Sequence, residues 1–309
     1  MRYLSTTLLL LFFFRVFAQD TGQSANTWIE LAPTGEYFRL FMPRTPRQEP
    51  QRARYGELQV NGAWYTAAAD GASYALWALH NENYQQNQDA DAYLDACAEL
   101  LWEALLQPAR DKLPKDGRIR AAMTYVKDLP AKPLAGREYS VTIGELTGTT
   151  QFFVAQQHIY ILMALNTPGG VWARARFFDS FIISPNLTIP AMVYGDPVTT
   201  GIRAANNDAN DYNRVFTGRE VTQKVRVLEK PEPTYTDAAR KYGVEGIVVL
   251  RSVFSKNGEV TNIYVVRKLP HGLTQSAIKA ARSIRFSAAL KDEQRVSMYM
   301  ELQYNFNLY

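Results

Sequence analysis

Residues able to carry acid–base or metal chemistry are few in this sequence and widely spaced. The histidines are His80, His158 and His271. No two of them have the His-Glu-x-x-His spacing that holds a metal ion on one helix face. Gly-x-Ser-x-Gly nucleophile motifs and Gly-rich phosphate loops are also missing. We therefore expect a protein that is not an enzyme and that uses neither a cofactor nor a metal ion.

Two other features of the sequence could support chemistry. Cys97 is the single cysteine, so this chain cannot form an internal disulfide or a multi-cysteine metal site. Leucines at helical spacing around Cys97 predict a buried thiol. Residues 206–213 are rich in Asn and Asp, as in a calcium loop. Counted from Asp208, however, the EF-hand pattern has Asn213 in place of Gly and Arg219 in place of Glu, which favours a solvated loop.

The secondary-structure pattern is clearest in the last quarter of the chain. Alternating and helical periods there predict two strands, a helix and a third strand, over residues 247–254, 259–268, 273–284 and 296–306. Asn257-Gly258 lies between the first two strands and favours a tight hairpin turn with positive φ angles. We expect the helix to cover one face of the sheet that these strands form.

Several motifs accompany this order of elements. Pro231-Glu-Pro-Thr-Tyr235 precedes a short helix, and Gly243-Val-Glu-Gly246 precedes the first strand. With these motifs, residues 231–309 resemble the C-terminal domain of TonB-type energy transducers. The resemblance implies a small ββαβ domain with a three-stranded antiparallel sheet. It also implies that a transporter's short extended segment pairs with the last strand.

The last strand holds the candidate binding residues. Its even-numbered positions from Met298 to Phe306 are apolar and are expected to face the helix. Its odd-numbered positions are mostly polar, with a single charge. The candidate partner-binding residues are Ser297, Tyr299, Glu301, Gln303 and Asn305. One interpretation is a central strand, or an edge covered by the preceding linker; the other is an edge that accepts an extended partner.

Residues 28–184 predict an exported α+β domain, an antiparallel α/β sandwich in which strands dominate. We expect a strand at 36–43, then a polar loop containing Pro46 and Pro50. The further expected strands are 55–70, 73–80, 118–127, 137–143, 149–156 and 159–166. The expected helices are 89–112 and 171–179. This pattern places His80 just after a strand and His158 in a turn between two strands.

Three short motifs accompany that order: Phe38-x-x-x-x-Pro43, Gly136-Arg-Glu138 and Phe178-Asp-Ser-Phe181. With them, residues 28–183 resemble exported domains of the PsbP/Mog1-like class. The resemblance implies that these motifs fix the packing of the domain and do not take part in a reaction.

The N-terminus predicts export. Arg2, the apolar run Leu8–Phe14 and Val16-Phe17-Ala18 form a signal-peptide pattern over residues 1–18. We expect cleavage after Ala18 and a periplasmic location; an uncleaved inner-membrane anchor is the alternative. Prolines and the Asn/Asp-rich stretch predict a linker over residues 185–230.

These observations leave three candidate functions. The first is a cell-envelope protein that binds an extended partner segment by strand addition, in energy transduction to outer-membrane transporters. Its partners would be a segment of a TonB-dependent outer-membrane receptor or inner-membrane motor proteins. The second is an envelope assembly protein without energy transduction, and the third is an enzyme in the first domain. The formal net charge is +4, but no nucleic-acid-binding motif accompanies it, so we expect no nucleic-acid partner.

Overall fold

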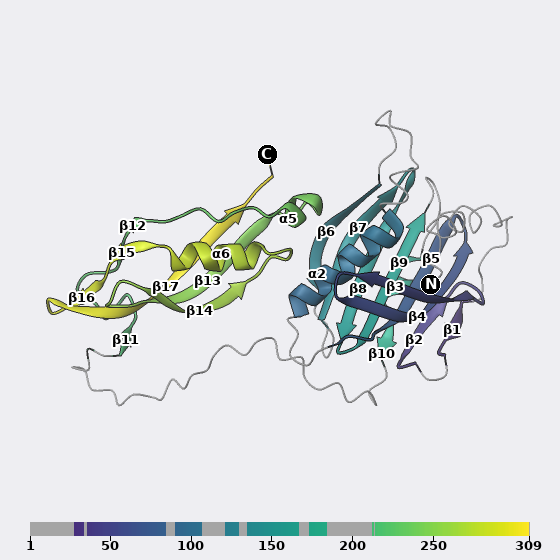
Figure 1. The fold of residues 1–309 in the computed structure, drawn as a ribbon, viewed down its shortest axis with the longest axis horizontal. Helices are drawn as coiled ribbons and strands as arrows, with labels where there is room; N and C mark the ends of the chain where they lie inside the picture. Colours follow the sequence, from purple (N-terminus) through teal and green to yellow (C-terminus); the bar gives the residue numbers. More distant parts are fainter. Residues whose placement is uncertain are drawn as a thin grey trace. The chain divides into compact units, whose positions relative to one another are not determined.

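A computed structural model describes residues 28–33, 36–84, 90–106, 121–129, 135–166, 173–183, 212 and 214–308 (Figure 1). The chain divides into two compact units, Met1–Tyr194 and Gly195–Tyr309. The predicted signal peptide lies outside the described residues, as does all of the Asn/Asp-rich stretch except Tyr212. Within the described ranges, the helices are too short or too polar to cross a membrane.

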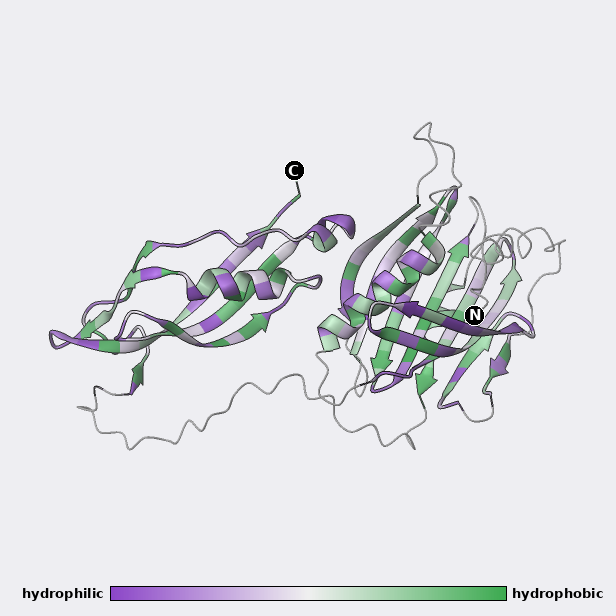
Figure 2. Ribbon diagram, in the orientation of Figure 1, coloured by the Kyte–Doolittle hydropathy of each residue, from purple (hydrophilic) through white to green (hydrophobic). Residues whose placement is uncertain are grey.

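The first unit is built on a seven-stranded sheet whose neighbouring strands are all antiparallel. In spatial order the strands are β3 (Arg47–Tyr55), β4 (Leu58–Ala69), β5 (Ala72–Asn81), β9 (His158–Asn166), β8 (Leu146–Ala155), β7 (Ala135–Ile143) and β6 (Ala121–Leu129). The prediction of a polar loop around Pro50 was wrong, because Pro50 lies within β3. This strand is hydrophilic and lies at the edge of the sheet, where proline is tolerated (Figure 2).

Different elements cover the two faces of this sheet. On one face, helix α2 (Ala90–Leu101) continues into a π-helical turn, η1 (Trp102–Leu106), and its Asp91 contacts Arg137 of β7. A small sheet packs on the other face. Its strands are β1 (Ile29–Leu31), β2 (Phe38–Met42) and β10 (Ile182–Ile183), and helix α4 (Arg174–Phe178) precedes β10. The mixed α+β content, mostly strands with few helices, agrees with the prediction.

The second unit contains the predicted ββαβ order. Its elements are β13 (Gly246–Phe254), β14 (Val260–Arg267), α6 (Leu273–Arg282) and β17 (Gln294–Phe306), with the short helix α5 (Asp237–Lys241) in front. In the hairpin turn, Gly258 has a φ of 91°, but Asn257 is not among the residues with positive φ. The turn spans residues 255–259 and closes through a Ser255 N–H to Glu259 carbonyl bond of 2.9 Å, so one left-handed residue is sufficient.

The sheet of this unit has more than the three predicted strands. Its order is β11-β17-β13-β14, and β16 (Ala289–Lys291) also pairs with β17. Strand β11 (Val215–Phe216) runs parallel to β17, while β12 (Arg226–Glu229) pairs with β15 (Arg285–Ser287). Both β11 and β12 lie inside the segment predicted as a linker. Strands of two to four residues show too little alternation to be recognised in a sequence.

The core of the second unit follows the predicted alternation. Met298, Leu302, Tyr304 and Phe306 of β17 are buried, and their register partners on β13 lie on the same face. Helix α6 has hydrophilic and hydrophobic bands, and it buries Leu273, Ala277 and Ala281 (Figure 2). Small alanines allow the helix to lie close to the sheet.

Candidate partner-binding edge

Strand β17 pairs with β13 over residues 298–306, and for most of that stretch no other described strand pairs with it. It forms an unbroken antiparallel register with β13, from Gly246 opposite Phe306 to Phe254 opposite Met298. Before that register begins, β16 pairs with Gln294–Val296. Strand β11 pairs with Ser297 and with Met298, the first residue of the register. From residue 299 to residue 306, β13 is the only strand in the described part of the chain that pairs with β17. We call residues 299–305 the open edge.

The backbone groups of the open edge alternate in direction. The Ser252 hydroxyl donates to the Met300 carbonyl oxygen at 3.5 Å, so this carbonyl lies on the side of β13. Successive residues of an antiparallel strand direct their N–H and C=O groups to opposite sides. The groups of the odd-numbered residues therefore point away from β13. A Lys230 Nζ to Gln303 carbonyl bond of 2.7 Å agrees with this direction.

The structure places four of the five predicted site residues on the open edge. Tyr299 is 37% exposed, and Glu301, Gln303 and Asn305 are exposed as well. Their side chains lie on the sheet face opposite the one that buries Tyr304 and Phe306. The fifth residue, Ser297, is half-buried: it pairs with β11, and its hydroxyl accepts a 3.1 Å bond from the Lys256 N–H. Ser297 therefore lies just before the open edge.

A Pro-rich segment, residues 230–235, lies beside the end of β17, and the sequence pattern did not predict this. Lys230 Nζ lies 4.5 Å from the ring centroid of Tyr304, and the ring of Tyr235 meets that of Phe306 edge-on at 5.7 Å. Burial, reinforced by the nearby Glu232, raises the pKa of Tyr304 to about 12. The segment cannot form a continuous strand ladder, because Pro231 and Pro233 have no N–H group.

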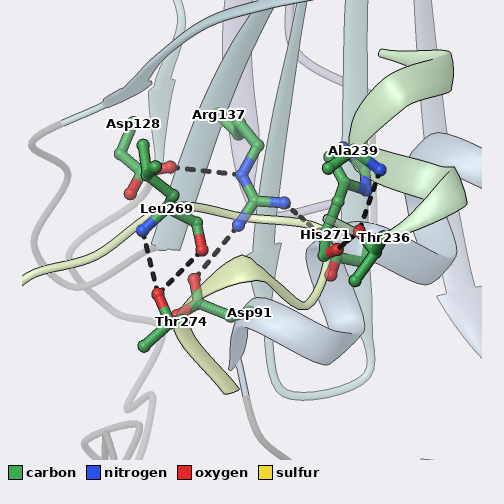
Figure 3. Close-up of polar contacts among 9 residues, drawn as sticks. Asp91, Asp128, Arg137, Thr236, Ala239, Leu269, His271 and Thr274 are labelled. Carbon is green, nitrogen blue, oxygen red and sulfur yellow. Dashed lines mark hydrogen bonds and ion pairs between the residues drawn. The ribbon is translucent and has the colours of Figure 1, made fainter. Parts of the chain in front are cut away.

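Thr236 fixes the end of this segment (Figure 3). Its hydroxyl caps α5 by accepting a 3.1 Å bond from the Ala239 N–H, and it donates to the His271 carbonyl at 2.6 Å. His271 lies just before α6, and its ring stacks on Tyr242 at 4.4 Å. One side chain thus joins the Pro-rich segment, α5 and the start of α6.

The first unit contains a buried charge cluster around Arg137 (Figure 3). The fully buried guanidinium bonds Asp95 of α2 and, at 3.1 Å each, Asp91 of α2 and Asp128 of β6. Neighbouring Glu138 accepts a 2.6 Å bond from Gln151. The Gly136-Arg-Glu138 motif therefore joins α2 to the sheet.

The cysteine and the two histidines of the first unit were also singled out in the sequence. Cys97 is buried, as predicted, and burial raises its thiol pKa. His158 does not lie in a turn, and His80 does not lie just after a strand: His158 begins β9 and is the register partner of His80, which lies within β5. Where residues are described, no three His, Cys, Asp or Glu side chains are arranged to hold a metal ion.

Comparison with known proteins agrees with the resemblance of the last quarter. Residues 231–308 match the family model described as Gram-negative bacterial TonB protein C-terminal. The solution NMR structure of the Pseudomonas aeruginosa TonB CTD is 16% identical, covering 31% of this chain and 99% of its own, with a TM-score of 0.25. The solution structure of cyanobacterial PsbP (CyanoP) from Synechocystis sp. PCC 6803 is 9% identical, covering 54% of this chain and 99% of its own, with a TM-score of 0.31. No curated protein sequence matches the chain.

Proposed function

We propose that the second unit binds an extended segment of a partner protein, which adds a strand to the open edge of β17. The observation that carries this proposal is the row of outward backbone groups at residues 299, 301, 303 and 305. Within the described ranges, no strand pairs with this row. An unpaired row of N–H and C=O groups is a template for another extended chain.

The open edge defines the length of the segment that it can bind. Seven residues at about 3.3 Å each span roughly 23 Å, which suits a partner segment of about seven residues. Backbone hydrogen bonds would supply most of the affinity, so many sequences could be bound. Tyr299 lies opposite the buried Val253 on the solvent-facing side of the sheet. An apolar partner side chain next to Tyr299 would extend this contact and give selectivity.

We infer that this binding takes place in the Gram-negative cell envelope and that the partner is a segment of an outer-membrane receptor. The match of residues 231–308 to the TonB C-terminal family supports this inference, and the predicted export signal is consistent with it. Binding without energy transduction, as in an assembly protein, is the second candidate function. The open edge supports it equally well. We propose binding, and no catalysis, as the activity.

A proline substitution in the open edge tests the proposal. Gln303→Pro removes an N–H group that points away from β13, so it should abolish binding of a receptor-derived extended peptide and leave the fold intact. Gln303→Ala keeps that N–H group and should bind within about threefold of the parent. Peptide affinity from calorimetry and a melting curve for each variant are the measurements. A folded Gln303→Pro protein that binds as tightly as the parent would show that strand addition does not occur here.

A further inference from the structure

A polar cluster lies at one end of the layer between β2 and the large sheet. His80 of β5 and His158 of β9 are register partners, and their ring centroids are 4.8 Å apart. Glu36, two residues before β2, brings its Oε1 within 3.4 Å of His80 Nε2. The cluster therefore joins both sides of this layer through one carboxylate and two imidazoles.

Part of this polar cluster is buried from solvent, and some of its polar atoms have no hydrogen-bond partner among the described residues. His158 is 5% exposed and Tyr160 is 1% exposed, and the ring of Tyr37 meets His158 edge-on at 5.4 Å. Three buried atoms have no hydrogen-bond partner among the described residues: His158 Nδ1, Glu36 Oε2 and the Tyr160 hydroxyl. Unsatisfied buried polar atoms are costly, and natural proteins keep few of them.

We propose that Glu36, His80 and His158 form an acid-sensitive clasp, which holds β2 and its neighbours β1 and β10 on the seven-stranded sheet and releases them as the pH falls. Among the described strands, β2 pairs only with β1 and β10 and makes no ladder with the large sheet. Side-chain packing holds it in place, including a contact of 5.5 Å between the Phe38 and Tyr160 ring centroids. Release therefore breaks no strand pairing of the large sheet.

Charge counting explains the sensitivity to acid. The single Glu36 carboxylate faces two imidazoles, so it can balance one imidazolium ion and not two. A second proton on His158 leaves one buried positive charge without a partner, which is unfavourable in a protein interior. Burial, and then the neighbouring His80, lower the pKa of His158 below 6.5, while Glu36 acts in the opposite direction.

A second carboxylate, Glu82, follows β5 and is exposed, and it accepts bonds from Gln59 and Asn61; of the carboxylates, Glu36 is the one that acts on His158. Tyr37 lies before β2, Tyr160 is on β9, and the register places Ala155 of β8 opposite His158. Burial, reinforced by Glu36, raises the pKa of Tyr65 and of Tyr160, so these phenols stay neutral. The open form takes up a proton near the ordinary pKa of 6.5, and the closed form does so only at lower pH. The closed form therefore loses stability as the pH falls below 6.5.

Hydrogen exchange of the β2 amides in the full chain tests the clasp. Once released, the three short strands should not keep their own pairing, because small isolated sheets are marginally stable in water. Between about pH 7.5 and pH 5.5, with intrinsic exchange corrected, protection of residues 38–42 should therefore fall about tenfold, the equivalent of one pKa unit. Protection of β13 serves as the internal reference. His158→Gln should remove the pH dependence of β2 protection.

The other two members of the cluster distinguish the clasp from general acid destabilisation. His80→Gln leaves Glu36 free to balance a protonated His158, so release should move to lower pH. Glu36→Gln leaves both imidazoles without a carboxylate, so release should move to higher pH. Opposite shifts, together with loss of the effect in His158→Gln, support the clasp. An unchanged pH dependence in His158→Gln, or equal shifts in the other two variants, would overturn it.

Discussion

Lys230 Nζ donates to the carbonyl oxygen of Gln303 at 2.7 Å, on the side of β17 where no described strand pairs at this position. The same ammonium group lies 4.5 Å from the ring centroid of Tyr304. Lysine is a common means of protecting an exposed strand edge from unwanted pairing. The sequence left two alternatives, an edge open to a partner and an edge covered by the linker. Lys230, the last residue of the predicted linker, covers one carbonyl of the edge, that of Gln303.

Removing the Lys230 ammonium should make the open edge easier to occupy. We expect Lys230→Met to increase peptide affinity about threefold to tenfold, because the Gln303 carbonyl loses a charge-assisted bond of about 1 kcal/mol at this exposed site. The variant should also self-associate more readily. Calorimetry and sedimentation velocity measure the two effects. Lys279→Met on α6 removes a charge of the same sign from a residue outside the open edge, and it is the control. Unchanged or weaker peptide binding by Lys230→Met would contradict the prediction.

The alternation of backbone directions in β17 predicts two different responses to proline. Met300→Pro removes an N–H group on the side of β13 and leaves its acceptor without a partner, so it should cost about 1–3 kcal/mol of unfolding free energy. Gln303→Pro removes an outward N–H group and should cost much less. Denaturant unfolding of both variants measures the difference. Equal losses would mean that the directions deduced from the Ser252 and Lys230 bonds are wrong.

The buried guanidinium of Arg137 should be important for the stability of the first unit. Arg137→Met leaves Asp91, Asp95 and Asp128 facing one another without a cation, and we expect a loss of about 3–5 kcal/mol. Asp128→Asn removes one of three partners and should cost clearly less. Urea unfolding at neutral pH measures both losses. The Arg137→Met loss should shrink in acid, where the carboxylates become neutral, and a loss independent of pH would argue against a charge effect.

Glu220 should make the attachment of β11 sensitive to acid. Its carboxylate accepts bonds of 2.7 Å from Arg214 Nη2, the Thr217 hydroxyl and the Thr217 N–H. The bond from Arg214 and then those from Thr217 lower the pKa of Glu220 to about 2. A lowered pKa stabilises the folded form above the ordinary value of 4.5, and this stabilisation is lost as the pH falls toward about 2.

The measurement for Glu220 is hydrogen exchange at Val215 and Phe216 as a function of pH. Protection should decrease between about pH 4.5 and pH 2 in the parent protein. In Glu220→Gln it should be low at every pH in this range. A parent-like pH response in the variant would show that other carboxylates control β11.

Local sequence determined the elements of the second unit that bear on binding. The alternation of β17 identified its buried face and the exposed residues Tyr299, Glu301, Gln303 and Asn305, because side chains of a strand alternate between two environments. Gly258 marked the hairpin, since its backbone reaches the positive φ that the turn requires. Such signals depend only on neighbouring residues, so one sequence is enough to find them.

Tertiary structure alone decided which distant residues meet. Strand β11 shortens the open edge by pairing with Ser297, and Lys230 binds the Gln303 carbonyl. His80 and His158 face each other because β5 and β9, far apart in the sequence, are neighbours in the sheet. These contacts depend on strand order and register, which many distant side chains set together, and no periodicity within a single segment records them.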